Sequence, residues 1–199
     1  MTYSIIGLKE GLLGVGVVSG SIAVGNRVPW ARPGVGGVIT QAYTNPALGP
    51  MILSFLEEGY SARRALSMAI SLDHGRVYRQ VAVMSYSGEK AVFTGESVPK
   101  PRKGLVGKNC ICIGNLLASE GVVDEMFKGF EEAEEKVLPH AILNALRRGH
   151  RAGGDSRGDK SGALIVVDDK SVILSVKIDY SEEPVNELHR KVESLYSPP

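Results

Sequence analysis

The pattern of apolar and polar positions predicts a chain in which groups of strands alternate with pairs of helices. Short apolar runs between turn residues predict strands over residues 2–8, 12–19, 35–42, 79–85, 90–94, 106–113, 163–167 and 172–178. Apolar residues spaced three and four apart predict helices over 47–58, 62–73, 119–135, 138–148 and 185–195. Asn45 and Ser61 are predicted to cap the first two helices. The segments 26–34 and 96–103 are predicted to be loops.

Short turns join the strands predicted over 2–8 and 12–19, 79–85 and 90–94, and 163–167 and 172–178 into hairpins, so an antiparallel sheet is expected. Many strands with one-sided patterning favour two stacked sheets, each covered on its outer face by helices. The predicted fold class is therefore α+β, a four-layer αββα sandwich. The length of 199 residues predicts one domain over 1–199.

Glycines are concentrated in the first fifth of the chain, and their spacing excludes the common phosphate-binding loops. Gly14, Gly16 and Gly20 do not form a dinucleotide fingerprint, and no helical pattern follows them. In a strand such glycines allow either close packing or the close approach of a ligand. Trp30 likewise has two interpretations, a packed anchor or a platform for a ligand. No cofactor is expected.

Charge and cysteine content narrow the class of protein. The 23 Lys and Arg nearly balance the 22 Asp and Glu, so no basic face for nucleic acid is predicted. No run of 18 apolar residues and no signal peptide is visible, so no membrane partner is expected. Cys110 and Cys112 would lie about 6.5 Å apart on a strand, which is poor disulfide geometry. They are predicted to be reduced and buried, as in a cytoplasmic protein, and no metal site is expected.

Three blocks of sequence resemble a known family. They are the opening MTYSI, the segment AVGNRVPWARPGVGGVITQAYTNPALGP and the loop AGGDSRGDKSGALIVV. Together they resemble a bacterial and archaeal family of unknown function, domain of unknown function 1028, which is classed with the N-terminal-nucleophile (Ntn) hydrolases. The resemblance covers residues 1 to about 195. It implies an αββα sandwich similar to a proteasome β subunit, and a homo-oligomer.

The resemblance also implies a nucleophile at the start of the chain. Ntn hydrolases cleave amide bonds with the side chain of the first residue of the mature chain, and its free α-amine serves as the base. Thr2 qualifies once Met1 is removed. An α-amine has a pKa near 8 and is partly neutral at cellular pH, so it can activate the neighbouring hydroxyl. The alternative is that Thr2 is an ordinary first residue of a strand.

Supporting groups are expected at strand ends and in loops. Gln41 and Asn45 could orient an amide substrate, and the backbone N–H groups of 40–42 could hold an oxyanion. By the resemblance, Asn115 falls at a site loop, and the loop 155–161 carries supporting acidic and hydroxyl groups. The superfamily's site lysine has no clear match. The candidate catalytic residues are Thr2, Gln41, Asp155 and Ser161, and the candidate substrate-binding residues are Asn45, Asn115, Arg157 and Asp159.

Several alternatives stay open at this point. The loop 155–161 could instead be a structural, salt-bridged turn, and Arg157 could pair with a substrate carboxylate, with Asp155 or with Asp159. Among the histidines, His150 is nearest to this loop, although a surface role is favoured for it. The functional hypotheses are an amidohydrolase acting on a small-molecule amide or N-acyl compound, a non-catalytic binding or self-assembling protein, and an enzyme with another nucleophile. The other nucleophiles considered are Ser4, Ser19 and Ser161.

Overall fold

A computed structural model describes residues 2–133 and 137–196. In this part of the chain, ten strands form two antiparallel sheets. The six-stranded sheet has the order β10-β9-β2-β1-β8-β7, and the four-stranded sheet has the order β3-β4-β5-β6. The strands of the larger sheet are β1 (Thr2–Lys9), β2 (Leu12–Ser19), β7 (Arg102–Val106), β8 (Cys110–Asn115), β9 (Ser161–Val167) and β10 (Val172–Ile178). Those of the smaller sheet are β3 (Pro29–Arg32), β4 (Gly36–Ala42), β5 (Arg79–Ser85) and β6 (Lys90–Thr94).

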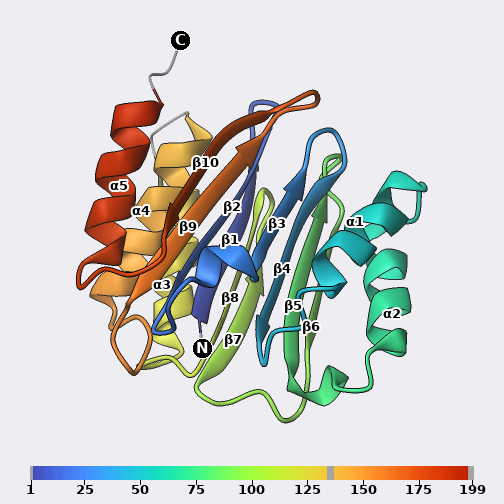
Figure 1. Ribbon diagram of the computed structural model, residues 1–199, viewed down its shortest axis with the longest axis horizontal. Helices are drawn as coiled ribbons and strands as arrows, with labels where there is room; N and C mark the ends of the chain where they lie inside the picture. Colours follow the sequence, from blue (N-terminus) through green and yellow to red (C-terminus); the bar gives the residue numbers. More distant parts are fainter. Residues whose placement is uncertain (1, 134–136, 197–199) are drawn as a thin grey trace.

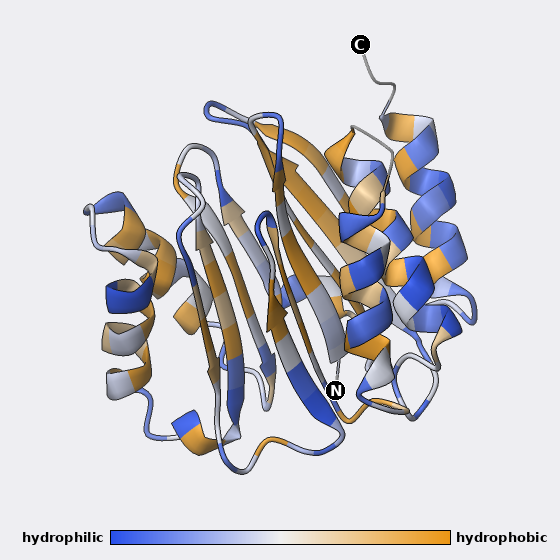
Figure 2. Cartoon of the chain, turned by 180° about the vertical axis from the view of Figure 1, so that it is seen from behind, coloured by the Kyte–Doolittle hydropathy of each residue, from blue (hydrophilic) through white to orange (hydrophobic). Residues whose placement is uncertain are grey.

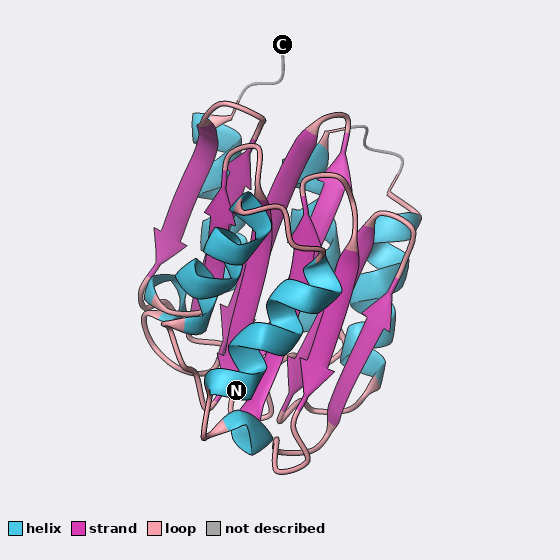
Figure 3. Cartoon of the chain, turned by 90° about the vertical axis from the view of Figure 1, so that its right-hand side faces the viewer, coloured by secondary structure: helices cyan, strands magenta, loops and turns pink. Residues whose placement is uncertain are grey.

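Helices cover both outer faces of the stacked sheets (Figure 1). On one side lie α1 (Leu48–Glu57) and α2 (Ala62–Leu72), which cross the smaller sheet (Figure 3). On the other side lie α3 (Gly121–Glu131), α4 (Leu138–Arg151) and α5 (Pro184–Leu195). Two short 3₁₀ turns, η1 (Val24–Asn26) and η2 (Arg76–Tyr78), precede β3 and β5. The predicted αββα sandwich is confirmed.

Three apolar clusters fill the spaces between the layers. The cluster between the sheets contains Ile6, Ile39 and Ile111, all fully buried. The other two clusters lie between each sheet and its helices. Figure 2 shows hydrophobic residues along the strands and hydrophilic residues on the outer faces of the helices. Because successive side chains of a strand point to opposite faces, each strand contributes to two layers of packing.

The glycines of β2 and the tryptophan serve packing. A Cβ added at Gly14 or Gly16 would lie 2.5 or 2.6 Å from the side chain of Ile142 in α4. A Cβ at Gly49 would lie 2.4 Å from the ring of Trp30, whose Nε1 donates to the carbonyl of Arg27. Gly14 and Gly16 therefore allow close packing of α4, and Trp30 is a packed anchor.

Two edge strands were missed by the sequence pattern. β3 lies in the segment predicted as a loop, because Pro29 stands first in a strand at a sheet edge, where proline costs no ladder hydrogen bond. β7 begins at Arg102 within the other predicted loop, and basic residues are common on edge strands. The strand predicted over 106–113 therefore begins too early: Val106 ends β7, and β8 starts at Cys110.

Smaller differences concern the helix ends. Ser61 caps α2 as predicted, because its hydroxyl accepts from the N–H of Arg64. Asn45 is not the N-cap of α1; that residue is Ala47, whose N–H donates to Asn45 Oδ1 over 3.2 Å. The helix predicted over 119–135 ends at Glu131, and residues 134–136 lie outside the described part. Cys110 and Cys112 are buried and form no disulfide, as predicted. No helix formed by the described residues has the length and apolar character that a bilayer crossing requires.

Candidate active site between the sheets

Thr2 opens the strand at the middle of the larger sheet. β1 pairs with β2 on one side and with β8 on the other, and this places Thr2 opposite both Ser19 and Asn115. Residues directly opposite in neighbouring strands share a face. Ile6, four residues along the same face, belongs to the apolar cluster between the sheets. Thr2 therefore directs its side chain into the sandwich, where only 3% of the residue is exposed.

Polar side chains from both sheets gather at this end of the sandwich. We refer to Thr2, Ser4, Ser19, Gln41, Gln80 and Asn115 as the inter-sheet polar cluster. Apart from Thr2, each of its members is fully buried. Burying a polar group costs free energy unless the group is hydrogen-bonded. The hydrogen bonds within this cluster therefore stabilise this end of the core.

The bonds of the cluster run from the nucleophile candidate across to the smaller sheet. Thr2 Oγ1 lies 3.1 Å from Ser19 Oγ. Gln41 Nε2 donates to the carbonyl oxygen of Thr2 over 3.4 Å and to Gln80 Oε1 over 2.8 Å. Ser4 Oγ donates to Gln41 Oε1 over 2.7 Å. The Gln41 amide therefore holds the backbone of Thr2, and both of its polar atoms are engaged within the cluster.

Asn115 leaves one polar atom unused. Its Nδ2 donates to Gln80 Oε1 over 3.0 Å, whereas its Oδ1 is buried without a hydrogen-bond partner. Buried polar atoms without partners are rare in folded proteins. Asn115 ends β8 and lies opposite Thr2, which starts β1. The unused acceptor is therefore on the strand that pairs with the candidate nucleophile.

The loop 155–161 ties the end of β2 to the rest of the molecule. The Asp155 carboxylate accepts from the backbone N–H of Gly20 over 2.8 Å and forms an ion pair with Arg157 at 2.9 Å. This pairing raises the pKa of the Arg157 guanidinium. Ser161 Oγ donates to the carbonyl of Ser21 over 2.5 Å. Asp155 and Ser161 are buried. Their hydrogen bonds to Gly20 and Ser21 hold the segment that follows Ser19.

A second buried group lies on the opposite face of β1. Tyr3 donates its hydroxyl to Asp159 Oδ2 over 2.6 Å, and His150 Nδ1 lies 2.7 Å from the same oxygen. Burial, and then the neighbouring Asp159 carboxylate, raise the pKa of Tyr3 well above its ordinary value. Tyr3 therefore stays protonated and donates. His150 takes part in a defined contact at the end of α4, more than the surface role that the sequence favoured.

The structure brings some of the predicted site residues together and separates others. Thr2, Gln41 and Asn115 share one hydrogen-bonded cluster. Asp155, Arg157 and Ser161 instead bond to Gly20 and Ser21, and Asp159 accepts from Tyr3. Asn45 lies apart from both groups, beside Asp73, whose pKa is lowered by the hydrogen bond from Arg79 and, to a smaller extent, by the Asn45 side chain. Within the described residues, no group of three or more His, Cys, Asp or Glu lies together as metal ligands would.

Two of the three expected oxyanion donors are already occupied. The N–H of Thr40 donates to Val28. The N–H of Tyr43 donates to Tyr78, and since ladder bonds recur at every second residue, the N–H of Gln41 donates to Gln80. Only the N–H of Ala42 is left outside these bonds. Ala42 has a φ of 69°, in the left-handed region that few side chains adopt.

Sequence reasoning missed Gln80, which joins both sheets at the site. A signal was present, since period-two spacing puts Gln80 on the same face as Ala82 and Met84, two members of the apolar cluster between the sheets. A glutamine at the end of such a face has to find partners inside the core.

Two stacked antiparallel sheets between layers of helices form an αββα sandwich, and a buried threonine opens the central strand of its larger sheet. The ancestral β-subunit Anbu from Yersinia bercovieri superposes with a TM-score of 0.50 at 12% identity, over 97% of this chain and 94% of that one. This likeness shows the fold alone. A closer likeness is to protein SPO2555 from Silicibacter pomeroyi, described as a DUF1028 protein, with a TM-score of 0.92 at 27% identity over 99% of this chain and 87% of that one.

Residues 2–188 match the model of the family of unknown function DUF1028, and the chain belongs to this family. A search of the curated proteins finds no match.

Proposed function

We propose that the protein is an amidohydrolase that cleaves an amide or N-acyl bond of a small molecule, with Thr2 as nucleophile after removal of Met1. The observation that carries the proposal is the place of Thr2: it opens the central strand of an Ntn-type sandwich, and its hydroxyl lies 3.1 Å from Ser19 Oγ within a buried polar cluster. A hydroxyl needs a base beside it, and a free α-amine on the same residue supplies one.

The proposed reaction has two steps. In the first, Thr2 Oγ1 attacks the substrate carbonyl while its proton passes to the α-amine, and the C–N bond breaks as that proton moves to the leaving nitrogen. The product is an ester on Thr2 and a free amine. In the second, water activated by the same α-amine cleaves the ester and releases the acid. General-base help of this kind contributes about 10²- to 10⁴-fold in rate.

Nearby groups support these steps in different ways. The unused Asn115 Oδ1 is an acceptor for the α-amine that the removal of Met1 creates. The N–H of Ala42 is the candidate oxyanion donor, a contribution of about 10²- to 10³-fold for a well-placed donor. Gln41 positions Thr2 through its carbonyl. In this proposal Asn115 and Gln41 are positioning residues.

The loop residues and Asn45 receive more remote roles in the proposal. Asp155 and Ser161 position the segment after Ser19. Asp159 holds Tyr3 on the far face of β1. Arg157, with 40% of its side chain exposed, is the remaining candidate for contact with a charged substrate, and Asn45 stays a candidate for contact at the end of β4. The proposal also includes a cytoplasmic homo-oligomer of one domain, in line with the family resemblance.

The first test is the intact mass of the protein made in its native host. We expect a mass short by one methionine, which would expose the Thr2 α-amine. The processed protein is then assayed with a panel of amides and N-acyl compounds, together with Thr2→Ala and Thr2→Ser. All three residues are small, so Met1 removal should be the same in each. Thr2→Ala should lose about 10⁴-fold in activity or more, and Thr2→Ser should keep a large part. Full activity of Thr2→Ala would refute the assignment.

A second candidate function is a non-catalytic binding or self-assembling protein with Met1 retained. The observation that favours it is the burial of Thr2, of which 3% is exposed, since a nucleophile has to be reached by its substrate. A full-length mass together with no hydrolysis of any compound in the panel would favour this candidate. Hydrolysis that survives Thr2→Ala and is lost in Ser19→Ala would point to another nucleophile.

A further inference from the structure

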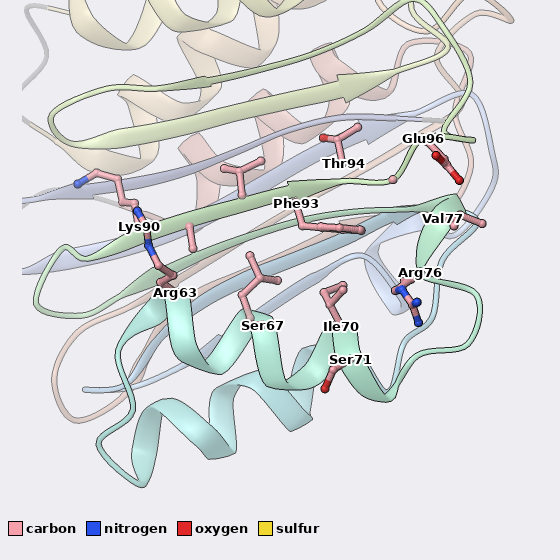
Figure 4. Close-up of a pocket in the computed structure, with 14 residues that line it drawn as sticks. Arg63, Ser67, Ile70, Ser71, Arg76, Val77, Lys90, Phe93, Thr94 and Glu96 are labelled. Atoms are coloured by element: carbon pink, nitrogen blue, oxygen red, sulfur yellow. The ribbon is translucent and has the colours of Figure 1, made fainter.

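A groove runs along the open edge of the smaller sheet, outside the inter-sheet polar cluster, which it meets at Thr94, the acceptor of a hydrogen bond from Gln80 Nε2. It lies between α2 and β6 and has a volume of about 1010 Å³. Figure 4 shows Phe93 on its floor between the strand and the helix, with Ile70 facing it from α2. The groove therefore combines an apolar floor with the free edge of a strand.

The edge of β6 offers backbone groups in a regular row. β6 pairs only with β5 in the described sheet. The bonds from Ser85 to Glu89 and from Gly95 to Arg79 fix the alternation of the ladder, which turns the odd-numbered residues of β6 toward β5. The N–H and C=O groups of Lys90, Val92 and Thr94 then point outward, at the spacing that a further strand requires.

The charges around this edge have one dominant sign. Figure 4 shows Arg63 beside Lys90 at one end of the groove and Arg76 with Glu96 at the other. Arg63 and Arg76 make no ion pair with any residue that the structure describes, and Lys90 Nζ donates only to the carbonyl of Gly88. Three cations thus face one carboxylate, although the whole chain has a net charge of only +1.

We propose that this groove binds an extended acidic peptide segment of a partner protein, which adds a strand to the edge of β6. In such binding, main-chain hydrogen bonds supply affinity and the surroundings of alternate side chains supply specificity. Here the row of outward backbone groups supplies the affinity. The cations at both ends, with Phe93 between them, supply the specificity. The inference is independent of the proposed hydrolysis.

The probe is a fluorescent, end-capped heptapeptide of alternating Glu and Val, titrated into the full-length protein by fluorescence anisotropy. Two control peptides accompany it: one with Lys in place of Glu, and one N-methylated at its three central residues, which blocks both backbone edges. We expect binding of the acidic peptide that weakens as salt rises, and at least about tenfold weaker binding of both controls.

Three protein variants locate the site. Arg63→Glu and Arg76→Glu should each raise the Kd about fivefold to tenfold. Arg64→Glu is the matched control, because Arg64 is also exposed on α2 but does not line the groove, and its Kd should stay unchanged. Circular dichroism checks that each variant is folded.

Three results of the peptide titrations would overturn the proposal. They are equal binding of the acidic and basic peptides, an Arg64→Glu effect as large as that of Arg63→Glu, and no binding up to about 1 mM, the weakest affinity of practical interest. Light scattering is run alongside. A dimer that Arg63→Glu disrupts would mean that the occupant is a second copy of the chain, and this would also overturn the assignment of an acidic partner segment.

Discussion

At the scale of single residues, the candidate site depends on the buried amide side chains of Gln41, Gln80 and Asn115, and among them Gln80 has no bonding capacity to spare. Gln80 makes all four hydrogen bonds that its amide allows: Oε1 accepts from Gln41 and Asn115, and Nε2 donates to Thr94 and to the carbonyl of Lys103. Gln80 thereby connects Gln41 of the smaller sheet with Asn115 of the larger sheet. Without Gln80, the buried Asn115 Nδ2 would lose its acceptor and Gln41 Nε2 would keep only its bond to Thr2.

Gln80→Met tests this interpretation at nearly constant side-chain volume. The change leaves Asn115 Nδ2 without its acceptor and Gln41 Nε2 with only the 3.4 Å bond to Thr2. The unsatisfied Asn115 donor costs about 1–3 kcal/mol and the bond that Gln41 loses about 0.5–1.5 kcal/mol, so the free energy of unfolding should fall by about 1.5–4.5 kcal/mol. Urea denaturation measures it.

Thr94→Val is the control for Gln80→Met, because it removes a single 3.3 Å bond at an exposed residue. Its cost should stay below about 1 kcal/mol. If both substitutions cost equally little, the inter-sheet polar cluster does not depend on Gln80, and its role in positioning Thr2 has to be abandoned.

At the scale of elements, the connection from α2 to β5 is stabilised by one ion pair. Asp73 follows α2 and Arg79 begins β5; Arg79 Nε donates to Asp73 Oδ2 over 2.7 Å, and Arg79 Nη1 donates to the carbonyl of Tyr43 at the end of β4. The bonds from Arg79 hold the pKa of Asp73 below its ordinary value of 3.8. The pair therefore joins α2, β4 and β5 at the end of the sheet that carries Gln41.

The lowered pKa of Asp73 sets the pH dependence of this stabilisation. Because the folded-state value lies below the unfolded one, the contribution is fully present above pH 3.8 and is lost as the pH falls through the folded-state pKa. Asp73→Asn should lower the free energy of unfolding at pH 7 by about 1–3 kcal/mol. The difference between wild type and variant should shrink as the pH is lowered below 3.8.

Urea unfolding at a series of pH values measures this difference, with Asp169→Asn in an exposed turn as the control. A difference between wild type and Asp73→Asn that stays constant down to the acid limit would show that the bonds of Asp73 do not depend on its charge.

Elements with strong apolar patterns were predictable from the sequence, and those at sheet edges were not. β1, β2, β4, β5, β6 and both closing strands follow their predicted ranges closely. β3 and β7 were missed because an edge strand needs neither a continuous apolar run nor a donor at every residue. The candidate site was predicted only in part for a related reason. Thr2 and Gln41 stand out at strand ends, whereas Gln80, which joins Gln41 to Asn115, lies within an apolar strand pattern and could not be assigned to the site without the pairing of the strands.

At the scale of the whole molecule, the space between the sheets has two different ends. The polar end contains the cluster around Thr2, and the opposite end is filled by Leu13, Met84 and other apolar side chains. Opening the polar end exposes little apolar surface and returns its groups to water, so this end should open at a lower free energy. A substrate has to reach a residue that is 3% exposed, and such an opening provides the route.

Amide hydrogen exchange resolved by NMR tests this asymmetry within single strands. Met84 and Ile111 lie toward the other ends of β5 and β8. We expect the amides of Gln80 and Asn115 to exchange at least about tenfold faster than those of Met84 and Ile111. A factor of ten corresponds to about 1.4 kcal/mol in opening free energy. Gln80→Met should widen the gap, because it removes bonds only at the polar end. Equal protection at both ends would describe a closed sandwich around a buried Thr2 hydroxyl, and would favour the binding or assembly function over hydrolysis.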